Sequence, residues 1–115
     1  MLVQAKLRVG VLLVELENEL RALGWWESQA PAAQALQSQQ PFCVDTLEFS
    51  QWLQWIFIPR MQSIVLTQQP LPKQCAIFEM ATVVYREQSV VTAALQRCLK
   101  NIDAAIMSQQ VLHCA

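Results

Sequence analysis

The amino-acid sequence predicts an all-α protein of one domain, an antiparallel four-helix bundle with a proline-kinked central second helix. Its 115 residues fit a single domain over positions 1–115. The chain contains only two glycines, whereas strands joined by hairpins need many glycine-rich turns. Apolar residues recur instead at spacings of three and four, which gathers them on one face of a helix. Four such segments joined by short links are typical of an antiparallel bundle.

The first expected helix covers residues 3–23. Its apolar stripe consists of Val9, Leu12, Leu13, Leu16, Leu20 and Leu23. Gly24 stands where a left-handed C-terminal cap ends a helix, because glycine adopts a positive φ without steric cost. We expect Trp25 and Trp26 to fold back onto the end of the bundle, and residues 27–42 to form a connection.

The second helix has the clearest start signal. Asp45 and Glu48 fit a capping box, in which the two side chains accept hydrogen bonds from backbone N–H groups that the first turn leaves free. Residues 49–58 are apolar almost all round, apart from a narrow edge of two glutamines, so this helix is expected at the centre. Pro59 removes one backbone hydrogen bond and clashes with the preceding turn, so we expect a kink there.

A third helix is expected over residues 73–86 and a fourth over residues 90–109, because both stretches carry apolar positions at helical spacing. Pro70 and Pro72 favour an extended link before the third helix. Ser89 is the expected N-cap of the fourth helix, since its hydroxyl oxygen can accept a hydrogen bond from a free backbone N–H.

The composition excludes some classes of function. Hydrophobic residues make up 54% of the chain and charged residues 15%, and the net charge is −1. A chain that binds nucleic acid alone normally offers a basic face, which this balance does not supply. No apolar run reaches the roughly 20 residues that a membrane span needs. The first residues lack the pattern of a secretory leader, so we expect a cytoplasmic protein without membrane contact.

No set of residues resembles an active site, a cofactor site or a metal site. His113 is the only histidine, and nothing nearby can hold it as a base. Zinc needs paired ligands at short spacing, whereas the four cysteines are widely separated and only Cys114 has a close partner, His113. We therefore expect no cofactor, no metal and no enzymatic activity.

Arg60 and Glu79 are the charged residues that raise a structural question. Arg60 follows the proline, and Glu79 lies within an apolar run. A buried charge is costly unless it is paired, so the two residues are candidates for a structural ion pair. Trp52 and Trp55 could stack on nucleobases, but no basic residues lie between them, so core packing is the better interpretation.

The chain resembles the YqcC family of small bacterial helical proteins, a family long described as of unknown function. The matching segments are Gln40-Pro41-Phe42, Asp45-Thr46, Trp52-Leu53-Gln54-Trp55, Ile58-Pro59-Arg60-Met61, Gln69-Pro70-Leu71-Pro72 and Glu79-Met80-Ala81. The first helix matches only in its pattern, and residues 109–115 match nothing associated with the family. The resemblance implies a four-helix bundle and a genomic association with tRNA pseudouridine synthase C, the enzyme that isomerises one uridine of tRNA.

The resulting hypothesis is a non-enzymatic accessory protein that acts with tRNA pseudouridine synthase C. The chain is too short and too weakly basic to be that synthase itself. Arginine, methionine and aromatic residues are enriched in interface cores, which favours one group of residues as the partner-binding face. The group comprises Pro41, Phe42, Pro59, Arg60, Met61, Trp25 and Trp26.

Two other functions remain open from the sequence. One is a homodimeric structural bundle, because two-fold dimers are the commonest assembly. The other is a bundle that holds a small apolar ligand between Trp52, Trp55 and the third helix. With any of these functions, direct tight binding of tRNA is not expected, because the net charge is −1 and no run of lysine or arginine occurs. Arg97 and Lys100 lie close together on the fourth expected helix, and Asp103 follows one turn later and partly cancels their charge. We therefore expect the chain alone to bind tRNA with a dissociation constant of about 10⁻⁴ M or weaker, at the weak end of non-specific binding at physiological salt.

Overall fold

The computed structural model describes residues 2–67, 69–72 and 75–114, and within them the side chains of residues 5–67, 69–72 and 75–107. Helices and loops account for all of the described residues, and none of them forms a β-strand. The prediction of an all-helical fold is therefore confirmed.

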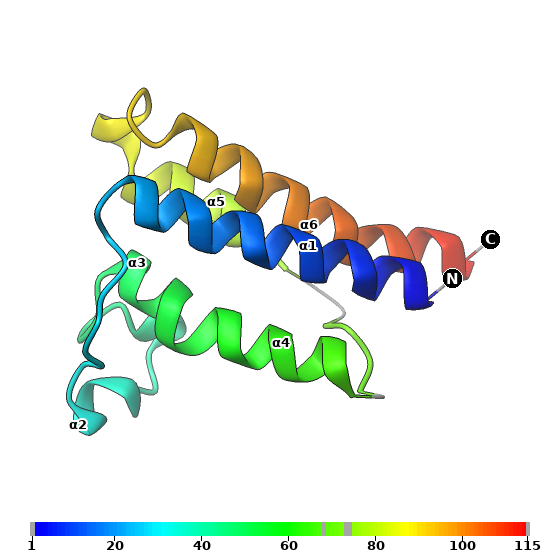
Figure 1. The fold of residues 1–115 in the computed structure, drawn as a ribbon, viewed down its shortest axis with the longest axis horizontal. Helices are drawn as coiled ribbons and strands as arrows, with labels where there is room; N and C mark the ends of the chain where they lie inside the picture. The colour runs from blue at the N-terminus through cyan, green and yellow to red at the C-terminus, as the bar shows by residue number, and fades with distance from the viewer. Residues whose placement is uncertain (1, 68, 73–74, 115) are drawn as a thin grey trace.

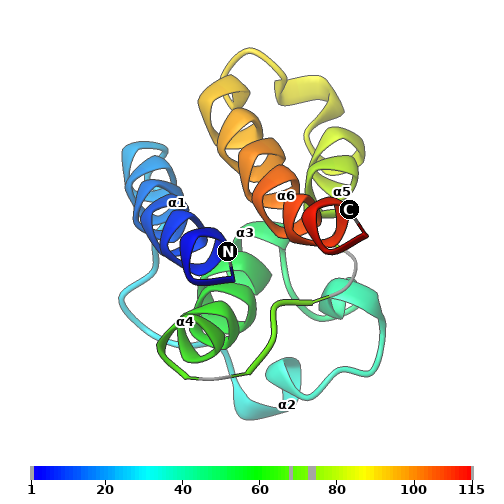
Figure 2. The same ribbon diagram turned by 90° about the vertical axis from the view of Figure 1, so that its right-hand side faces the viewer.

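Two long helices and several shorter helical segments make up the fold (Figure 1). The segments in chain order are α1 (Leu2–Ala22), α2 (Ala33–Leu36), η1 (Pro41–Cys43), α3 (Phe49–Trp52), η2 (Leu53–Phe57), α4 (Ile58–Leu66), α5 (Ile77–Val84), η3 (Arg86–Gln88) and α6 (Ala93–Cys114). The pairs α1 with α6, α5 with α6, and α1 with α4 are in contact. Along the chain the direction reverses from α1 to α4, from α4 to α5, and from α5 to α6 (Figures 1 and 2).

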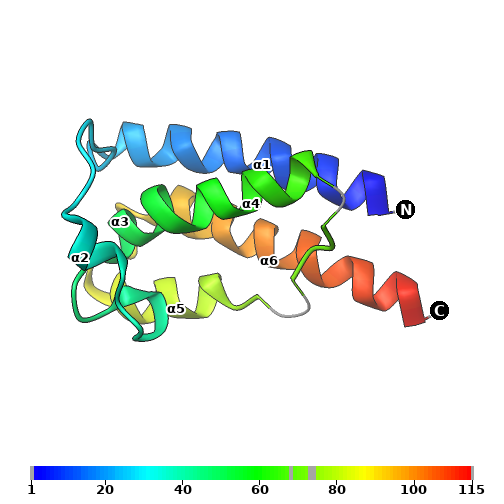
Figure 3. The ribbon, with the colours of Figure 1, turned by 90° about the horizontal axis from the view of Figure 1, so that it is seen from below.

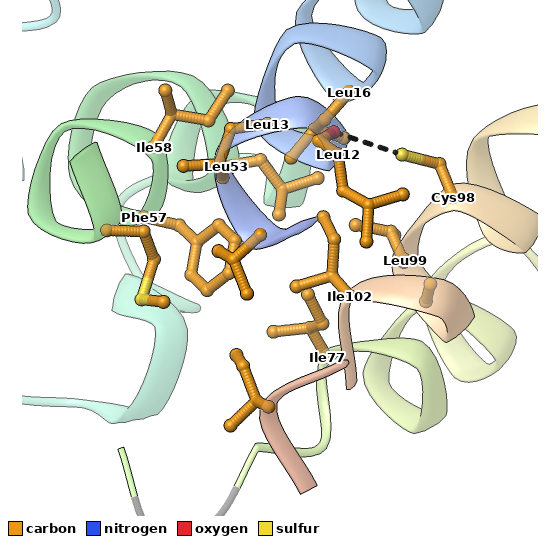
Figure 4. Close-up of a cluster of buried hydrophobic side chains, with 14 of the residues drawn as sticks. Leu12, Leu13, Leu16, Leu53, Phe57, Ile58, Ile77, Cys98, Leu99 and Ile102 are labelled. Atoms are coloured by element: carbon orange, nitrogen blue, oxygen red, sulfur yellow. Dashed lines mark hydrogen bonds between the residues drawn. The ribbon is translucent and has the colours of Figure 1, made fainter. Parts of the chain in front are cut away.

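The hydrophobic core lies between these helices (Figure 4). Leucines from one face of α1 meet Leu53 and Phe57 of η2 and the apolar face of α6. Cys98 of α6 faces α1, where its thiol donates a hydrogen bond to the backbone carbonyl of Leu12 at 3.5 Å. Every residue of the expected apolar stripe of the first helix is buried except Leu23, which is half-buried.

The end of α1 follows the expected cap. Gly24 has a φ of 77°, and its N–H donates to the carbonyl of Arg21, while the N–H of Trp25 donates to the carbonyl of Leu20. These two bonds form a Schellman motif, which satisfies carbonyls that the last helical turn leaves free. The chain is therefore turned sharply at this point, which carries Trp25 and Trp26 against the core.

The second helix begins three residues later than the sequence suggested. Its capping box is formed by Glu48 and Gln51, and the Glu48 N–H donates to Gln51 Oε1 at 2.8 Å. Asp45 instead accepts a hydrogen bond from the Ser38 hydroxyl, which fastens the loop before η1. Both carboxylates can cap a helix, and the structure uses Glu48, whose capping box with Gln51 places the buried Phe49 in the first turn.

The irregularity expected at Pro59 lies in the turn that precedes it. Residues Leu53–Phe57 form a π-helical turn, in which the Ile58 N–H donates to the carbonyl of Leu53. Proline has no N–H, and its ring clashes with the carbonyl four residues before it. A wider turn before Pro59 relieves that clash, and π-helical turns are commonly single insertions of this kind.

The boundaries of the last two helices also differ from those expected. Of the third expected helix, residues 73–74 lie outside the described residues, and α5 begins only at Ile77. Ser89 is exposed and precedes α6 by several residues, so it is not the N-cap. The residue before α6 is the fully buried Thr92, whose hydroxyl donates to the carbonyl of Gln88 at 2.7 Å.

The start of α5 is capped by a side chain from α6. The carboxylate of Asp103 accepts hydrogen bonds from the backbone N–H groups of Phe78 at 2.9 Å and Ile77 at 3.3 Å. A carboxylate at a helix N-terminus satisfies free N–H groups and favours the helix dipole. A short helix of this length is marginal alone, so Asp103 fixes α5 in place against α6.

We predict that Asp103→Ala lowers the free energy of unfolding by about 1–2 kcal/mol, since two backbone N–H groups lose their acceptor. Asp103→Asn retains one acceptor oxygen and should lose less. Urea unfolding followed by circular dichroism measures both changes. Glu87→Ala, an exposed carboxylate in η3, is the control, and a loss at Asp103 no larger than at Glu87 would contradict the capping role.

Candidate functional site

The Trp-Leu-Gln-Trp segment of α3 and η2 holds the loop that follows α1. Gln54 is only 5% exposed. Its Nε2 amide donates to the backbone carbonyl of Glu27 at 2.7 Å, and the Glu27 backbone N–H donates to Gln54 Oε1 at 2.8 Å. The side-chain amide thus pairs with both backbone groups of one residue, and this pairing leaves little freedom for the loop.

The side chain of Glu27 completes the connection. Its carboxylate accepts hydrogen bonds from the indole N–H of Trp55 at 3.1 Å and from the Gln51 amide at 3.2 Å. Gln51 and, one turn later, the adjacent residues Gln54 and Trp55 therefore converge on Glu27. The sequence favours core packing for both tryptophans: Trp52 packs against the core, whereas Trp55 is half-buried and its N–H donates to Glu27.

Aromatic rings form a continuous cluster beside this connection. Trp25 lies against Tyr85 with ring centroids 5.3 Å apart, and Tyr85 contacts Phe49 at 6.0 Å. Trp52 is stacked on Phe49 and on Phe57, and Phe42 meets it edge-on at 4.9 Å. Contacts of this geometry add about 0.5–1.5 kcal/mol each beyond the burial of area. The cluster joins the loop after α1, η1, α3 and α5 at one end of the bundle.

That end of the molecule carries two neighbouring hollows. The larger, about 420 Å³, is polar and is lined by residues that include Trp25, Glu27, Glu48 and Tyr85. The smaller, about 180 Å³, is lined mainly by apolar residues: Phe42, Val44, Leu47, Phe49, Met80 and Val84, together with Glu48. Glu48 and Phe49 line both, so the hollows adjoin at the start of α3. The short segments α2 and α3 lie at this same end of the molecule, the end at which α1 finishes (Figure 3).

The backbone beside the apolar hollow is strained. Phe42 has a φ of 57° and Cys43 a φ of 50°, although neither residue is glycine. This left-handed region is unfavourable for residues with a Cβ, and it persists only where surrounding contacts fix it. Here the contacts of Phe42 with Phe49 and Trp52 and the burial of Cys43 hold the turn. Such strain is frequently found at functional sites.

The Tyr85 hydroxyl has unusual surroundings. Tyr85 is 5% exposed, and its hydroxyl oxygen has no hydrogen-bond partner among the described residues. Burial raises the pKa of this hydroxyl to about 12, and the negative charge of Glu48 adds to the rise. The group therefore stays protonated at neutral pH. A buried polar atom without a partner is rare, because its desolvation costs free energy that nothing offsets.

The structure separates the residues of the expected partner-binding face. Pro41 is exposed, and Phe42, Trp25 and Trp26 are half-buried, so this part lies at the end that carries the hollows. The Arg21 guanidinium lies over the ring of Trp26, 4.9 Å from its centroid.

The residues of the same group on α4 divide between surface and core. Pro59 and Arg60 are exposed. Met61 is only 1% exposed and belongs to the core, so its inclusion in a surface was wrong. Its side chain points inward because it follows Ile58 at the spacing of one helical turn.

The expected ion pair between Arg60 and Glu79 is not formed. Both residues are exposed, so neither carries the cost of burial that suggested a pair. In the described part of the chain the salt bridge found is that of Arg21 with Glu17, at 2.8 Å on the surface of α1. Such a pair contributes about 0–1 kcal/mol.

No group of three possible metal ligands occurs among the described residues. The side chains of His113 and Cys114 lie outside the described side chains. Burial raises the pKa of Cys75 and of Cys98 to about 12, and Asp103 adds to the rise at Cys75. Both thiols are therefore protonated at neutral pH, and a protonated thiol is a poor nucleophile.

Comparison with known proteins identifies the family. Residues 8–105 match the model of the DUF446 family, described as tRNA pseudouridine synthase C. An uncharacterized protein named YqcC from Escherichia coli is 36% identical over 94 residues, which is 78% of this chain and 86% of that protein. The chain belongs to the YqcC family. An uncharacterized Haemophilus influenzae protein is 42% identical over 56% of this chain, and the match spans 61% of that protein's length.

The fold of this YqcC-family chain is shared with a solved structure. The solution NMR structure of YqcC from Escherichia coli matches with a TM-score of 0.81 at 32% identity, over 93% of this chain and 90% of the other. A different relative, named tRNA pseudouridine synthase C and found in Pectobacterium carotovorum, is 36% identical over 61 residues. That match spans 53% of this chain but 16% of the Pectobacterium protein.

Among the described residues, no helix combines the length and the hydropathy that crossing a membrane requires.

We predict that Gln54→Ala lowers the free energy of unfolding by about 2–3 kcal/mol, because it leaves both backbone groups of Glu27 without a partner. Gln62→Ala, at an exposed position of α4, is the matched control and should change stability by less than about 0.5 kcal/mol. Chemical unfolding of the two variants provides the comparison. Equal stability of the two variants would show that Glu27 is held by other contacts.

Proposed function

We propose that this YqcC-family chain is a non-enzymatic accessory protein that acts with tRNA pseudouridine synthase C in the formation of pseudouridine in tRNA. The observation that carries the proposal is the match to the Pectobacterium protein of that name. The matched segment is a small part of a much longer polypeptide. A segment joined to a synthase in one organism is a reasonable binding partner of the synthase where it is encoded separately.

The chemistry of the chain supports an accessory role. The aromatic and polar side chains that the family motif brings together are engaged with one another: Gln54 and Trp55 hold Glu27, and Trp52 is stacked between two phenylalanines. They serve the fold and do not converge on an open site with a nucleophile and a base. The net charge of −1 is also unsuited to holding tRNA phosphates, which leaves the synthase as the more suitable partner.

The apolar hollow beside η1 is the surface best suited to that partner. Val44 is 59% exposed at its rim, and Val84 and Phe42 are partly exposed within it. Apolar side chains gathered around a hollow are typical of protein–protein contacts. Phe42, from the expected face, lines this hollow, and the exposed Pro41 precedes it in η1. Pro59 and Arg60 are exposed at the start of α4 and do not line this hollow.

We expect tRNA pseudouridine synthase C to co-purify with the wild-type chain and to be recovered about tenfold less with Val44→Glu, because the partner would cover an unpaired charge beside the hollow; tenfold corresponds to about 1.4 kcal/mol. Leu66→Glu is the matched control, since Leu66 is 84% exposed at the distant end of α4. Affinity capture from the native host, with quantification by mass spectrometry, measures recovery. Circular dichroism checks that each variant is folded.

Failure of the wild-type chain to recover the synthase would reject the proposed function. Equal recovery with Val44→Glu and Leu66→Glu would remove the apolar hollow from the interface but leave the function standing. Arg60→Ala in the same series tests whether the exposed start of α4 takes part. Pseudouridine formed in tRNA by the synthase, with and without the chain, then measures whether binding affects activity.

A homodimer is the second candidate, and one surface favours it. Leu7, Val11 and Val14 are each more than half exposed and recur along α1 at helical spacing. They form an apolar stripe on the side of α1 that faces away from the core. A stripe on a long straight helix can meet the same stripe of a second copy across a two-fold axis.

On this alternative, the wild-type chain is a dimer in solution and Val11→Glu is a monomer, because each glutamate would lie at the centre of the shared stripe. Multi-angle light scattering over a range of protein concentrations measures the mass. Val90→Glu, at another exposed valine, should leave the mass unchanged. A wild-type chain that stays monomeric at the highest concentration excludes the dimer.

A further inference from the structure

The polar hollow at the start of α3 carries negative charge without a positive counterpart. Glu27 and Glu48 line it, and no lysine or arginine is among its lining residues. In the described part of the chain neither glutamate takes part in a salt bridge. A concave surface lined by one sign of charge favours a ligand of the opposite sign.

The hydrogen bonds that the two carboxylates accept come from neutral donors. Glu27 accepts from the Trp55 indole and the Gln51 amide. Glu48 caps the first turn of α3. These bonds fix the positions of the oxygens but do not neutralise them, and a carboxylate has more acceptor sites than these donors use. The hollow therefore offers a pre-positioned pair of acceptors.

The Tyr85 hydroxyl is a second, independent indication of a ligand. Tyr85 lines the hollow, is 5% exposed, and has a hydroxyl with no partner among the described residues. The hydroxyl oxygen retains lone pairs that can accept from an N–H donor. The oxygen itself is buried, so an N–H donor that enters the hollow reaches it after a small shift of the side chains that cover it.

An aromatic wall narrows the ligand to one chemical group. Trp25 lines the hollow and is packed on Tyr85 with the rings inclined by 32°. A guanidinium is planar, stacks on aromatic faces and presents five N–H donors in a fixed fork. An ammonium is a compact, strongly hydrated charge with three donors, so it fits separated acceptors beside an indole less well.

We propose that this hollow binds the guanidinium of an arginine side chain, with Glu27 and Glu48 as the anionic acceptors, the Tyr85 hydroxyl as a further acceptor and Trp25 as the stacking surface. The adjoining apolar hollow shares Glu48 and Phe49, so the arginine belongs to a segment with an apolar residue beside it. That the synthase supplies this segment rests on the proposed function. That the hollow binds a guanidinium does not depend on the proposed function.

The test uses the isolated chain labelled with ¹⁵N and the probe N-acetyl-L-arginine amide. The indole N–H signals of Trp25 and Trp55 report on the hollow, because Trp25 lines it and Trp55 binds Glu27. We expect saturable shifts of both signals. N-acetyl-L-citrulline amide has nearly the same shape without the charge, and it should bind at least about threefold more weakly, as expected for loss of a partly exposed charge pair.

Two variants assign the effect to the hollow. Glu48→Gln keeps a side-chain oxygen for the helix cap but removes the charge, and Tyr85→Phe removes only the unpartnered hydroxyl. Each should weaken binding of the arginine probe by about threefold or more. Tyr85→Phe should also leave the thermal unfolding midpoint unchanged or raise it, because no hydrogen bond is lost. Glu79→Gln, an exposed glutamate of α5 outside the hollow, is the matched control.

Equal binding of the arginine and citrulline probes overturns the proposal, as does equal behaviour of Glu48→Gln and Glu79→Gln. Spermidine distinguishes an ammonium ligand, and tighter binding of spermidine than of the arginine probe would also overturn the proposal. None of these titrations contains the synthase. If the chain binds the arginine probe but does not recover the synthase, the arginine site stands and the proposed function is rejected. If the chain recovers the synthase but does not bind the arginine probe, the proposed function stands and the arginine site is rejected.

Discussion

The pairing of Gln54 with the backbone of Glu27 is the interaction on which the rest of this end of the molecule depends. The chain leaves α1 through a Schellman motif and must return to the core before α2. A loop that runs against a helix exposes backbone groups to a dry environment, and each unpaired group is costly. The Gln54 amide satisfies both groups at once. With Glu27 fixed, Trp25 is placed against Tyr85. Glu27 itself lines the polar hollow.

The aromatic cluster and the two hollows are consequences of the same arrangement. Phe49 is the first residue of α3, and it contacts Phe42, Trp52 and Tyr85. Its backbone position is set by the capping box of Glu48 and Gln51, the second of which also reaches Glu27. The start of α3, the loop that follows α1 and the aromatic cluster therefore depend on one another. Residues that appear in the sequence as a family motif act here chiefly as structural connections, and the surfaces suited to ligands lie around them.

The sequence predicts the helices well because their signal is local. Leu16, Leu20 and Leu99 are fully buried on the faces that the three-and-four spacing indicates, and Gly24 ends α1 as its position suggested.

The sequence does not predict the caps and connections made by residues distant along the chain. Asp103 caps a helix that begins 26 residues earlier, and Gln54 binds a residue 27 positions before it. A glutamine within an almost wholly apolar helix was the available signal, since a buried amide needs partners. Met61 belongs to a residue type that is enriched in interfaces, but its helical spacing from Ile58 places it in the core.

The π-helical turn before Pro59 changes the phase of the helix that contains it. An α-helix repeats every 3.6 residues, so a residue inserted into one turn rotates everything beyond it by about 100°. Leu53 and Ile58 are both buried although five positions separate them, and from Ile58 onward the buried positions Met61 and Ile64 resume the spacing of three. Leu53 and Ile58 would lie about 140° apart around a regular α-helix, and the wide turn brings them closer to one face. Residues before this turn belong to the aromatic end of the bundle, and α4 beyond it lies along α1, so one helical segment packs against two neighbours.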